Sequence, residues 1–247
     1  MPLPAETIRN AVEKVAFFRN ASRGNAALDQ ALRWVKNFQS RRFEATYSDL
    51  LNSADFGAAS RFFLVELYGD RDYAERDAQF ARIAGTLQKY FPDSVVATAV
   101  ALAQLHALTE ELDFEMAKAS LTLDAENALD ESERYLKCWR LVERAEDRNQ
   151  QLDAVLNVGA ELNRLTQIRG LRMMLRMMRG PAKAAGLHAL QQFLESGFDT
   201  FSDMSSKRNL AIDFLGTIGQ REHVWIAKFF ESPIASCVSE LQERMNT

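Results

Sequence analysis

The sequence predicts an all-α protein, a single multi-helix bundle-like domain of about nine to eleven helices over residues 1–247. Apolar residues recur at helical spacing in nearly every segment, and no segment alternates apolar and polar residues as a half-buried strand does. The chain of 247 residues has only 5 prolines and 11 glycines, which disfavours turn-rich all-β folds. With 47% hydrophobic and 26% charged residues, its composition is that of an ordinary globular protein.

The first half of the chain contains amphipathic stretches followed by one long apolar stretch. Apolar stripes run through residues 8–17, 28–38 and 50–67. Pro92 ends the preceding helix, Asp93 or Ser94 caps the next one, and residues 93–121 read as a single long helix. Because its first half is apolar nearly all round, we expect this helix to be buried at the centre of the bundle.

Capping and helix-breaking signals divide the second half. Asp130 and Glu133 have the spacing of a capping box. Gly180–Pro181 predicts a break, because proline lacks a backbone donor and clashes with the preceding turn. We place a sub-boundary of the domain near residues 180–181. Further helices are expected over residues 182–201, 206–230 and 233–245.

Net charge and cysteine content limit the partners and the cellular compartment that we expect for the protein. The net charge of -4 gives no overall attraction to nucleic acid or to anionic membranes. Cys138 and Cys237 are far apart and neither belongs to a CxxC pair, which favours buried, reduced thiols over disulfides or a thiolate metal site. The N-terminus lacks the apolar core of a signal peptide, and no run reaches the roughly 18 apolar residues of a membrane span. We expect a soluble cytoplasmic protein with no transmembrane segment.

The densest group of charged and aromatic residues is RFFLVELYGDRDYAERDAQF, residues 61–80. We interpret it as a corner between two helices, with Gly69 as the left-handed residue after the first and Asp72 with Glu75 as the capping box of the second. Its charged groups then serve helix ends and each other. Glu66 falls between apolar residues, so an inward-facing Glu66 would need a cation or could act as a metal ligand or general base.

Two stretches resemble a known family. The pattern R-F-F-L-x-x-L-Y-G at Arg61–Gly69, followed by D-x-x-x-R-D-x-Q-F-A-R from Asp72 to Arg82, resembles a motif of an uncharacterised family of bacterial, mainly proteobacterial, helical proteins. The stretch Arg179–Phe201 also resembles that group. The resemblance implies an all-helical fold, and it carries no activity and no catalytic residue.

Three histidines limit the metal chemistry of the chain: His106, His188 and His223. None has a glutamate three residues before it, as the ferritin-like di-iron motif requires. A carboxylate–histidine site of the haem-oxygenase-like di-iron kind could use Glu66, His106 and Glu110, which would make the protein a metal-dependent oxidase or oxygenase. The simpler interpretation is a partly buried His106 hydrogen-bonded to Glu110.

Other ligand and catalytic signatures are weak. His188 is flanked by small residues that would let a haem approach the helix, although Gly186 can equally mark close helix packing. A pocket for an apolar ligand, lined by Phe62, Phe63 and methionines, is a further alternative. The sequence contains no GxSxG, Walker A, GxGxxG, kinase or CxxCH motif.

The most distinctive remaining feature is RLTQIRGLRMMLRMMRGPAK, residues 164–183, which is both basic and rich in methionine. On one helix, Leu171, Met174, Leu175 and Met178 would form an apolar face, and the opposite face would carry the basic residues Arg172, Arg176, Arg179 and Lys183. Such a helix can dock on an acidic groove, an anionic bilayer or a polyanion. Alternatively, its methionines fill an irregular core while its arginines pair with the acidic residues of 109–115 or 123–133.

The leading hypothesis is a non-enzymatic helical binding protein. Its contact surface is the basic Met-rich helix, and its partner is an acidic protein or an anionic ligand. No aromatic residue interleaves the arginines, so the pattern does not indicate a stacking platform for nucleic acid. The metal-dependent oxidase and the apolar-ligand pocket remain the alternatives.

Overall fold

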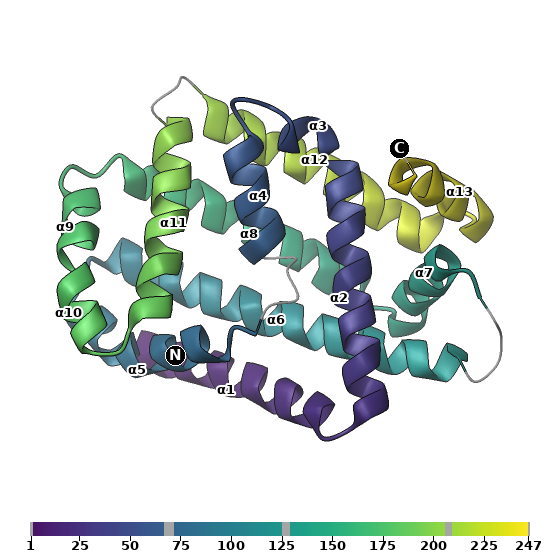
Figure 1. Ribbon diagram of the computed structural model, residues 1–247, viewed down its shortest axis with the longest axis horizontal. Coiled ribbons are helices and arrows are strands. Elements are labelled where there is room, and N and C mark those ends of the chain that lie inside the picture. Colours follow the sequence, from purple (N-terminus) through teal and green to yellow (C-terminus); the bar gives the residue numbers. More distant parts are fainter. Residues whose placement is uncertain (1, 67–71, 125–128, 206–208, 247) are drawn as a thin grey trace. The chain divides into compact units, whose positions relative to one another are not determined.

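The computed structural model describes residues 2–66, 72–124, 129–205 and 209–246, and all regular secondary structure in these residues is helical (Figure 1). The predicted all-α class is confirmed. In chain order the helices are α1 (Pro4–Arg23), α2 (Ala26–Thr46), α3 (Ser48–Leu51), α4 (Gly57–Glu66), α5 (Ala74–Tyr90), α6 (Asp93–Asp124), α7 (Glu131–Val142), α8 (Ala145–Thr166), α9 (Leu171–Met177), α10 (Arg179–Ala184), α11 (His188–Ser205), α12 (Leu210–Glu231) and α13 (Ile234–Met245).

The described residues form thirteen helices where nine to eleven were expected. The difference comes from short helices: α3 has 4 residues, α9 has 7 and α10 has 6. Periodicity finds long amphipathic helices, but a helix of one or two turns has too few residues to show a period.

The helices fall into two compact units. The first comprises Met1–Ala16, Arg71–Ala107 and Ala154–Gly216, and the second comprises Phe17–Asp70, Leu108–Asp153 and Thr217–Thr247. The sub-boundary expected near residues 180–181 does not separate them, since those residues lie within α10 in the first unit. The break itself is local. The chain turns at Met178, and Pro181 lies near the start of α10, where a missing N–H is tolerated.

Small side chains form a core cluster in the first unit. The buried residues of α1 pack against buried alanines of α5 and α6, and the cluster consists of Ala5, Ile8, Ala11, Val15, Ala84, Ala103 and Ala107. Close approach also occurs between α8 and α12, because a Cβ on Gly159 would lie 2.6 Å from Leu215 Cδ2. Helices with such small contact residues can pack at short range without leaving a cavity.

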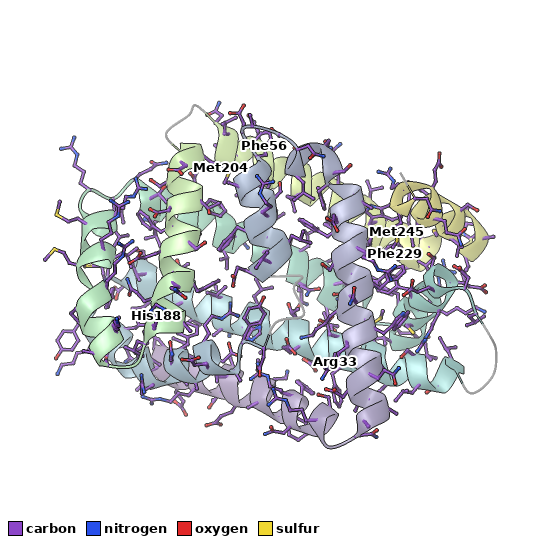
Figure 2. All side chains as sticks on the ribbon, in the orientation of Figure 1. Arg33, Phe56, His188, Met204, Phe229 and Met245 are labelled. Atoms are coloured by element: carbon purple, nitrogen blue, oxygen red, sulfur yellow. The ribbon has the colours of Figure 1, made fainter. Side chains whose placement is uncertain are left out.

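Aromatic side chains form the core of the second unit. The rings of Phe38 and Tyr135 stack with centroids 4.3 Å apart, and Phe229 lies 4.9 Å from Trp139 and 5.2 Å from Trp225. Phe229, labelled in Figure 2, belongs to α12. Helix α13 packs beside α7 and α2 (Figure 1). Cys138 and Cys237 are buried in this unit, as the sequence predicts.

Helix α6 contributes to both units, and its second half is the more buried. Leu112, Met116 and Ala117 are fully buried there, whereas most apolar residues before Ala103 are only partly buried. The apolar first half, on which the expectation of a buried central helix rested, is therefore the less buried part of α6. By length and composition alone, residues 93–123 could span a membrane, with a mean hydropathy of 1.2, and the core helix of a globular protein meets the same criterion.

Aspartate side chains accept hydrogen bonds from backbone N–H groups at the starts of α7 and α5, as the sequence predicts. Asp130 caps α7 by accepting hydrogen bonds from the backbone N–H groups of Ser132 and Glu133 at 3.0 and 3.4 Å. Asp72 accepts from Ala74 N at 3.0 Å where α5 begins, but Glu75 accepts from Gln79 and does not complete a capping box. The predicted role of Gly69 concerns a residue outside the described ranges.

Candidate functional site

The basic Met-rich stretch folds into two short helices, α9 and α10, in the first unit. Gly170 precedes α9 with a φ of 85°, a left-handed conformation that glycine adopts at little cost. Helix α9 then ends at Met177 and α10 begins at Arg179. No residue of α9 is buried, so this helix lies on the surface, packed along one side against α11 (Figure 1).

The arginines of the stretch turn toward α11. Arg172 Nε donates to Asp199 Oδ1 at 2.8 Å, and Arg176 Nη2 lies 3.9 Å from the same carboxylate. Arg179 Nε donates to both carboxylate oxygens of Glu195 at 2.8 Å. These hydrogen bonds from Arg179 are the main reason that the pKa of Glu195 lies below its ordinary value. The partners of the arginines are therefore on α11, and the expected pairing with residues 109–115 or 123–133 was wrong.

The methionines of the stretch face solvent. Met173 and Met177 are 68% and 72% exposed, and Met174 and Met178 are 36% and 39% exposed. Only Leu171 and Leu175 of the predicted apolar face are half-buried. The interpretation in which the methionines fill a core was wrong. The carboxylates of α11 attract the arginines, and this orientation leaves exposed the three methionines of α9 and Met178 after it, which we call the Met patch.

Basic residues are concentrated in the sequence around the Met patch. Residues 162–194 contain six basic side chains and no Asp or Glu, although the whole chain carries a net charge of -4. Ion pairs to α11 and to Glu161 involve four of the six basic side chains, which are Arg164, Arg172, Arg176 and Arg179. Arg169 and Lys183 are exposed at either end of the α9–α10 stretch. The charge segregation is visible in the sequence and could have been found there.

The structure gives separate partners to His106 and Glu110, the two α6 residues of the metal alternative. His106 Nε2 lies 3.2 Å from Asp77 Oδ2 of α5, and the hydrogen bond expected between His106 and Glu110 was wrong. Glu110 accepts from Lys36 Nζ of α2 at 2.6 Å. Glu66 is the last residue of α4 and is half-buried. Within the described ranges, no three His, Cys, Asp or Glu side chains form a group that could hold a metal ion.

The side chain of Arg76 lies beside the Asp77–His106 pair. The Arg76 guanidinium lies over the ring of Tyr73 at 4.0 Å and over that of Phe193 at 4.5 Å. Its Nε atom is 3.7 Å from Asp77 Oδ1. Cation–π contact with two rings fixes the cation beside the buried carboxylate. The arrangement joins α5 to α11 and serves the packing of the first unit.

The histidine of the haem alternative lies at a helix start. His188 is the exposed first residue of α11 and is labelled in Figure 2. Gly186, two residues before it, has a φ of 65°, and its carbonyl accepts from Arg82 Nη2 at 2.8 Å. Gly186 therefore serves a left-handed turn between α10 and α11, which is a different role from the close helix packing that the sequence suggested.

The second unit contains a buried ionic network that sequence patterns did not reveal. Arg42 Nη1 and Nη2 donate to the two oxygens of Glu222 at 2.9 and 2.8 Å, and Tyr47 Oη donates to Glu222 Oε1 at 2.9 Å. Nearby in sequence, Gln39 Nε2 donates to Asp113 Oδ1 at 3.0 Å. The polar residues of α2 at positions 36, 39 and 42 recur at helical spacing, which is the only local signal of an inward polar stripe.

Burial governs the ionisation of Asp113. Loss of solvation raises the pKa of its carboxyl, and Glu110 acts in the same direction, whereas Lys36, Arg148 and the Gln39 amide oppose it. A raised pKa means that the folded state holds this proton more tightly than the unfolded state. The free energy of unfolding should therefore fall as pH rises from the ordinary value of 3.8 through the raised pKa.

Replacing Asp113 by asparagine should stabilise the protein at neutral pH by on the order of 1 kcal/mol. Asparagine keeps an oxygen that can accept from Gln39 and carries no charge to desolvate. Urea unfolding as a function of pH measures the effect, and the gain should vanish below about pH 4, where the wild-type carboxyl is protonated in both states. Asp153→Asn, at an exposed position of the same unit, is the control and should change stability by less than about 0.5 kcal/mol. A destabilised Asp113→Asn variant at neutral pH would show that the ionised carboxylate is the favoured form.

Comparison with known proteins places most of the chain in one family. A family model described as "Domain of unknown function (DUF8198)" matches residues 19–234. The matched range includes the stretches at 61–82 and 179–201 on which the resemblance to an uncharacterised helical family rests. No curated protein and no solved structure matches the chain.

Proposed function

The chain belongs to the DUF8198 family, a domain family of unknown function, and we propose that it works as a non-enzymatic binding protein. Its contact surface is the Met patch of α9 with the basic residues around it. The partner is a protein segment that forms an amphipathic helix, apolar on one side and acidic on the other. The observation that carries this proposal is the exposure of four methionines, three on α9, which has no buried residue, and Met178 directly after it.

The apolar part of the proposal rests on the properties of methionine. Its side chain is flexible and polarisable, so a Met-rich surface can adapt to the apolar face of a helix. Large apolar side chains gathered in one place on a surface are typical of interaction sites. Met173 and Met177 are one helical turn apart, which matches the spacing at which a docked helix presents its own apolar residues.

Charge supports an acidic partner. The six basic residues of 162–194 have no acidic residue among them in sequence, and Arg169 and Lys183 extend the positive charge to both ends of the α9–α10 stretch. A protein helix suits this surface better than an anionic bilayer does. Membrane-binding helices insert Trp, Phe and Leu, whereas α9 has only seven residues and its Arg172 and Arg176 are already paired to Asp199.

Several finer expectations remain predictions. The cytoplasmic location rests on the two cysteines, which lie far apart and outside any CxxC pair, and the bacterial origin rests on the motif at Arg61–Gly69. The basic residues Arg172, Arg176, Arg179 and Lys183 belong to the proposed contact surface. The first three also bind α11, so reversing their charges would disturb the protein as well as the partner.

Replacing Met173 and Met177 together by glutamine should weaken binding of an acidic amphipathic helix by about tenfold or more. Burial of each methionine is worth about 1.5–3 kcal/mol, and about 1.4 kcal/mol corresponds to tenfold in affinity. The measurement is fluorescence anisotropy with a labelled synthetic helix that has leucines at i, i+3, i+4 and i+7 and glutamates on the other face. Binding should weaken as the salt concentration rises.

The control variant is Ile212→Gln, which changes an exposed apolar residue of α12 in the same unit and should leave the affinity unchanged. A second control probe carries lysines in place of the glutamates and should bind at least about tenfold more weakly. No binding of the acidic helix, or equal binding of both probes, would contradict the proposal. Preferential binding to phosphatidylserine vesicles would assign the surface to a membrane.

A further inference from the structure

The accessible sulfur atoms of the described chain are concentrated at one place. Met116 and Met204 are buried, Met245 is half-buried, and Cys138 and Cys237 are buried thiols. The four methionines of the Met patch are exposed and lie within six consecutive residues, 173–178. Because a thioether must meet its oxidant in solvent, these four should react well before the buried sulfurs.

We propose that the Met patch is a site of reversible methionine oxidation that releases the acidic helical partner. The co-reactant is a peroxide, such as hydrogen peroxide. A sulfur lone pair attacks one peroxide oxygen, the O–O bond breaks, and the products are a sulfoxide and one water molecule. The sulfur is oxidised and the peroxide is reduced. A methionine sulfoxide reductase reverses the step, with two thiols forming a disulfide and the sulfoxide oxygen leaving as water.

Oxidation at this position should change the surface and leave the fold intact. None of the residues of α9 is buried, so a polar sulfoxide on Met173 or Met177 occupies solvent and disturbs no core. Arg172 of α9 and Arg179 of α10 also hold the stretch to α11, and their hydrogen bonds do not involve the methionines. A sulfoxide on Met116 would instead place a polar group in a fully buried site, at the cost of an unsatisfied acceptor.

The effect on the partner follows from the change in polarity. The sulfoxide oxygen is a strong acceptor, and Arg176 lies three residues after Met173 on α9, within reach of its side chain. Oxidation thus replaces an apolar contact by a hydrated polar one, and it engages a cation that would otherwise face the acidic partner. This consequence rests on the proposed function, whereas the selectivity of oxidation does not.

The first experiment treats the full chain with hydrogen peroxide and maps sulfoxides by peptide mass spectrometry. Met173 and Met177 should be converted at least about tenfold faster than Met116 and Met204, with an unchanged circular dichroism spectrum. In denaturant all methionines should react alike. Equal oxidation rates of exposed and buried methionines in the folded protein would contradict the proposed oxidation site. A loss of helicity at partial oxidation would also contradict it.

The second experiment measures binding of the acidic synthetic helix before and after oxidation. The affinity should fall by about tenfold or more and return after treatment with a methionine sulfoxide reductase. A variant with leucine at positions 173, 174, 177 and 178 keeps the apolar volume and should bind the helix with or without peroxide. Binding that persists after complete oxidation overturns the switch and leaves the proposed function standing. Failure of the untreated wild type to bind overturns the proposed function, while the sulfoxide map still decides the oxidation site.

Discussion

Replacing Glu222 by alanine is expected to lower the free energy of unfolding by about 3–5 kcal/mol, the usual cost of breaking a buried ion pair. Arg42 and Glu222 are only 3% and 7% exposed. Removing the Glu222 carboxylate breaks its bidentate hydrogen bonds with the Arg42 guanidinium. It also removes the acceptor for the Tyr47 hydroxyl. The Arg42 guanidinium then stays buried without the carboxylate whose attraction offset the free-energy cost of its desolvation.

Tryptophan fluorescence during urea unfolding is the measurement, because all three tryptophans, Trp34, Trp139 and Trp225, belong to the second unit that contains the pair. The neighbouring residue supplies a matched control. Arg221 binds Asp49 with the same two-pronged geometry, at 2.7 Å for each contact, but the Asp49 side chain is largely exposed. Asp49→Ala should therefore cost at most about 1 kcal/mol, since solvent screens an exposed pair.

The double variant Arg42→Met with Glu222→Leu separates the loss of the ion pair from the cost of leaving Arg42 buried without its carboxylate partner. It removes both charges and fills the space with apolar side chains, so it should be more stable than Glu222→Ala alone. If Glu222→Ala costs no more than Asp49→Ala, the buried pair does not stabilise the second unit in the way that its geometry indicates.

The second large effect is expected for Phe229→Ala, which should cost about 3–5 kcal/mol. Phe229 is 1% exposed and contacts the rings of Trp139, Trp225 and Tyr135. Truncation removes these contacts and leaves a cavity that large neighbouring rings fill poorly. Trp139 and Trp225 should also report the change directly, through a shifted emission maximum in the folded state.

Phe17→Ala is the control for Phe229→Ala, because it makes the same substitution at a residue that is 65% exposed. Its effect on stability should stay within about 0.5 kcal/mol. An equal loss for the two variants would mean that burial of Phe229 is not the origin of the cost. A Phe229→Leu variant should recover much of the stability, since leucine fills part of the same volume.

The helical class was predictable because it depends on local periodicity and on capping side chains. The spacing of apolar residues requires only that one face of each segment be buried, and Asp130 starts α7 through bonds to residues two and three positions away. The boundaries of the shortest helices were not predictable in this way. Met178 is the C-cap of α9 and the N-cap of α10, and its side chain makes no capping hydrogen bond.

The candidate site was only partly predictable. The sequence singled out residues 164–183, but Met and Arg alternate so closely in this stretch that a helix could bury either set. The choice depends on Glu195 and Asp199, which lie 16 and 27 residues away from Arg179 and Arg172, respectively. Likewise, Glu110 and His106 are one turn apart on α6, yet Lys36 and Asp77 on other helices provide their partners.

The helical class, the burial of the two cysteines and the concentration of basic residues within 162–194 can be predicted from the amino-acid sequence alone. These properties follow from composition and from contacts within a few turns. The packing of the helices, by contrast, turns the arginines of α9 toward the carboxylates of α11 and leaves the methionines in solvent, and it pairs Arg42 with Glu222, which is 180 residues away in sequence. Such pairings depend on which helices pack together, and an isolated amphipathic segment contains no information about its neighbour.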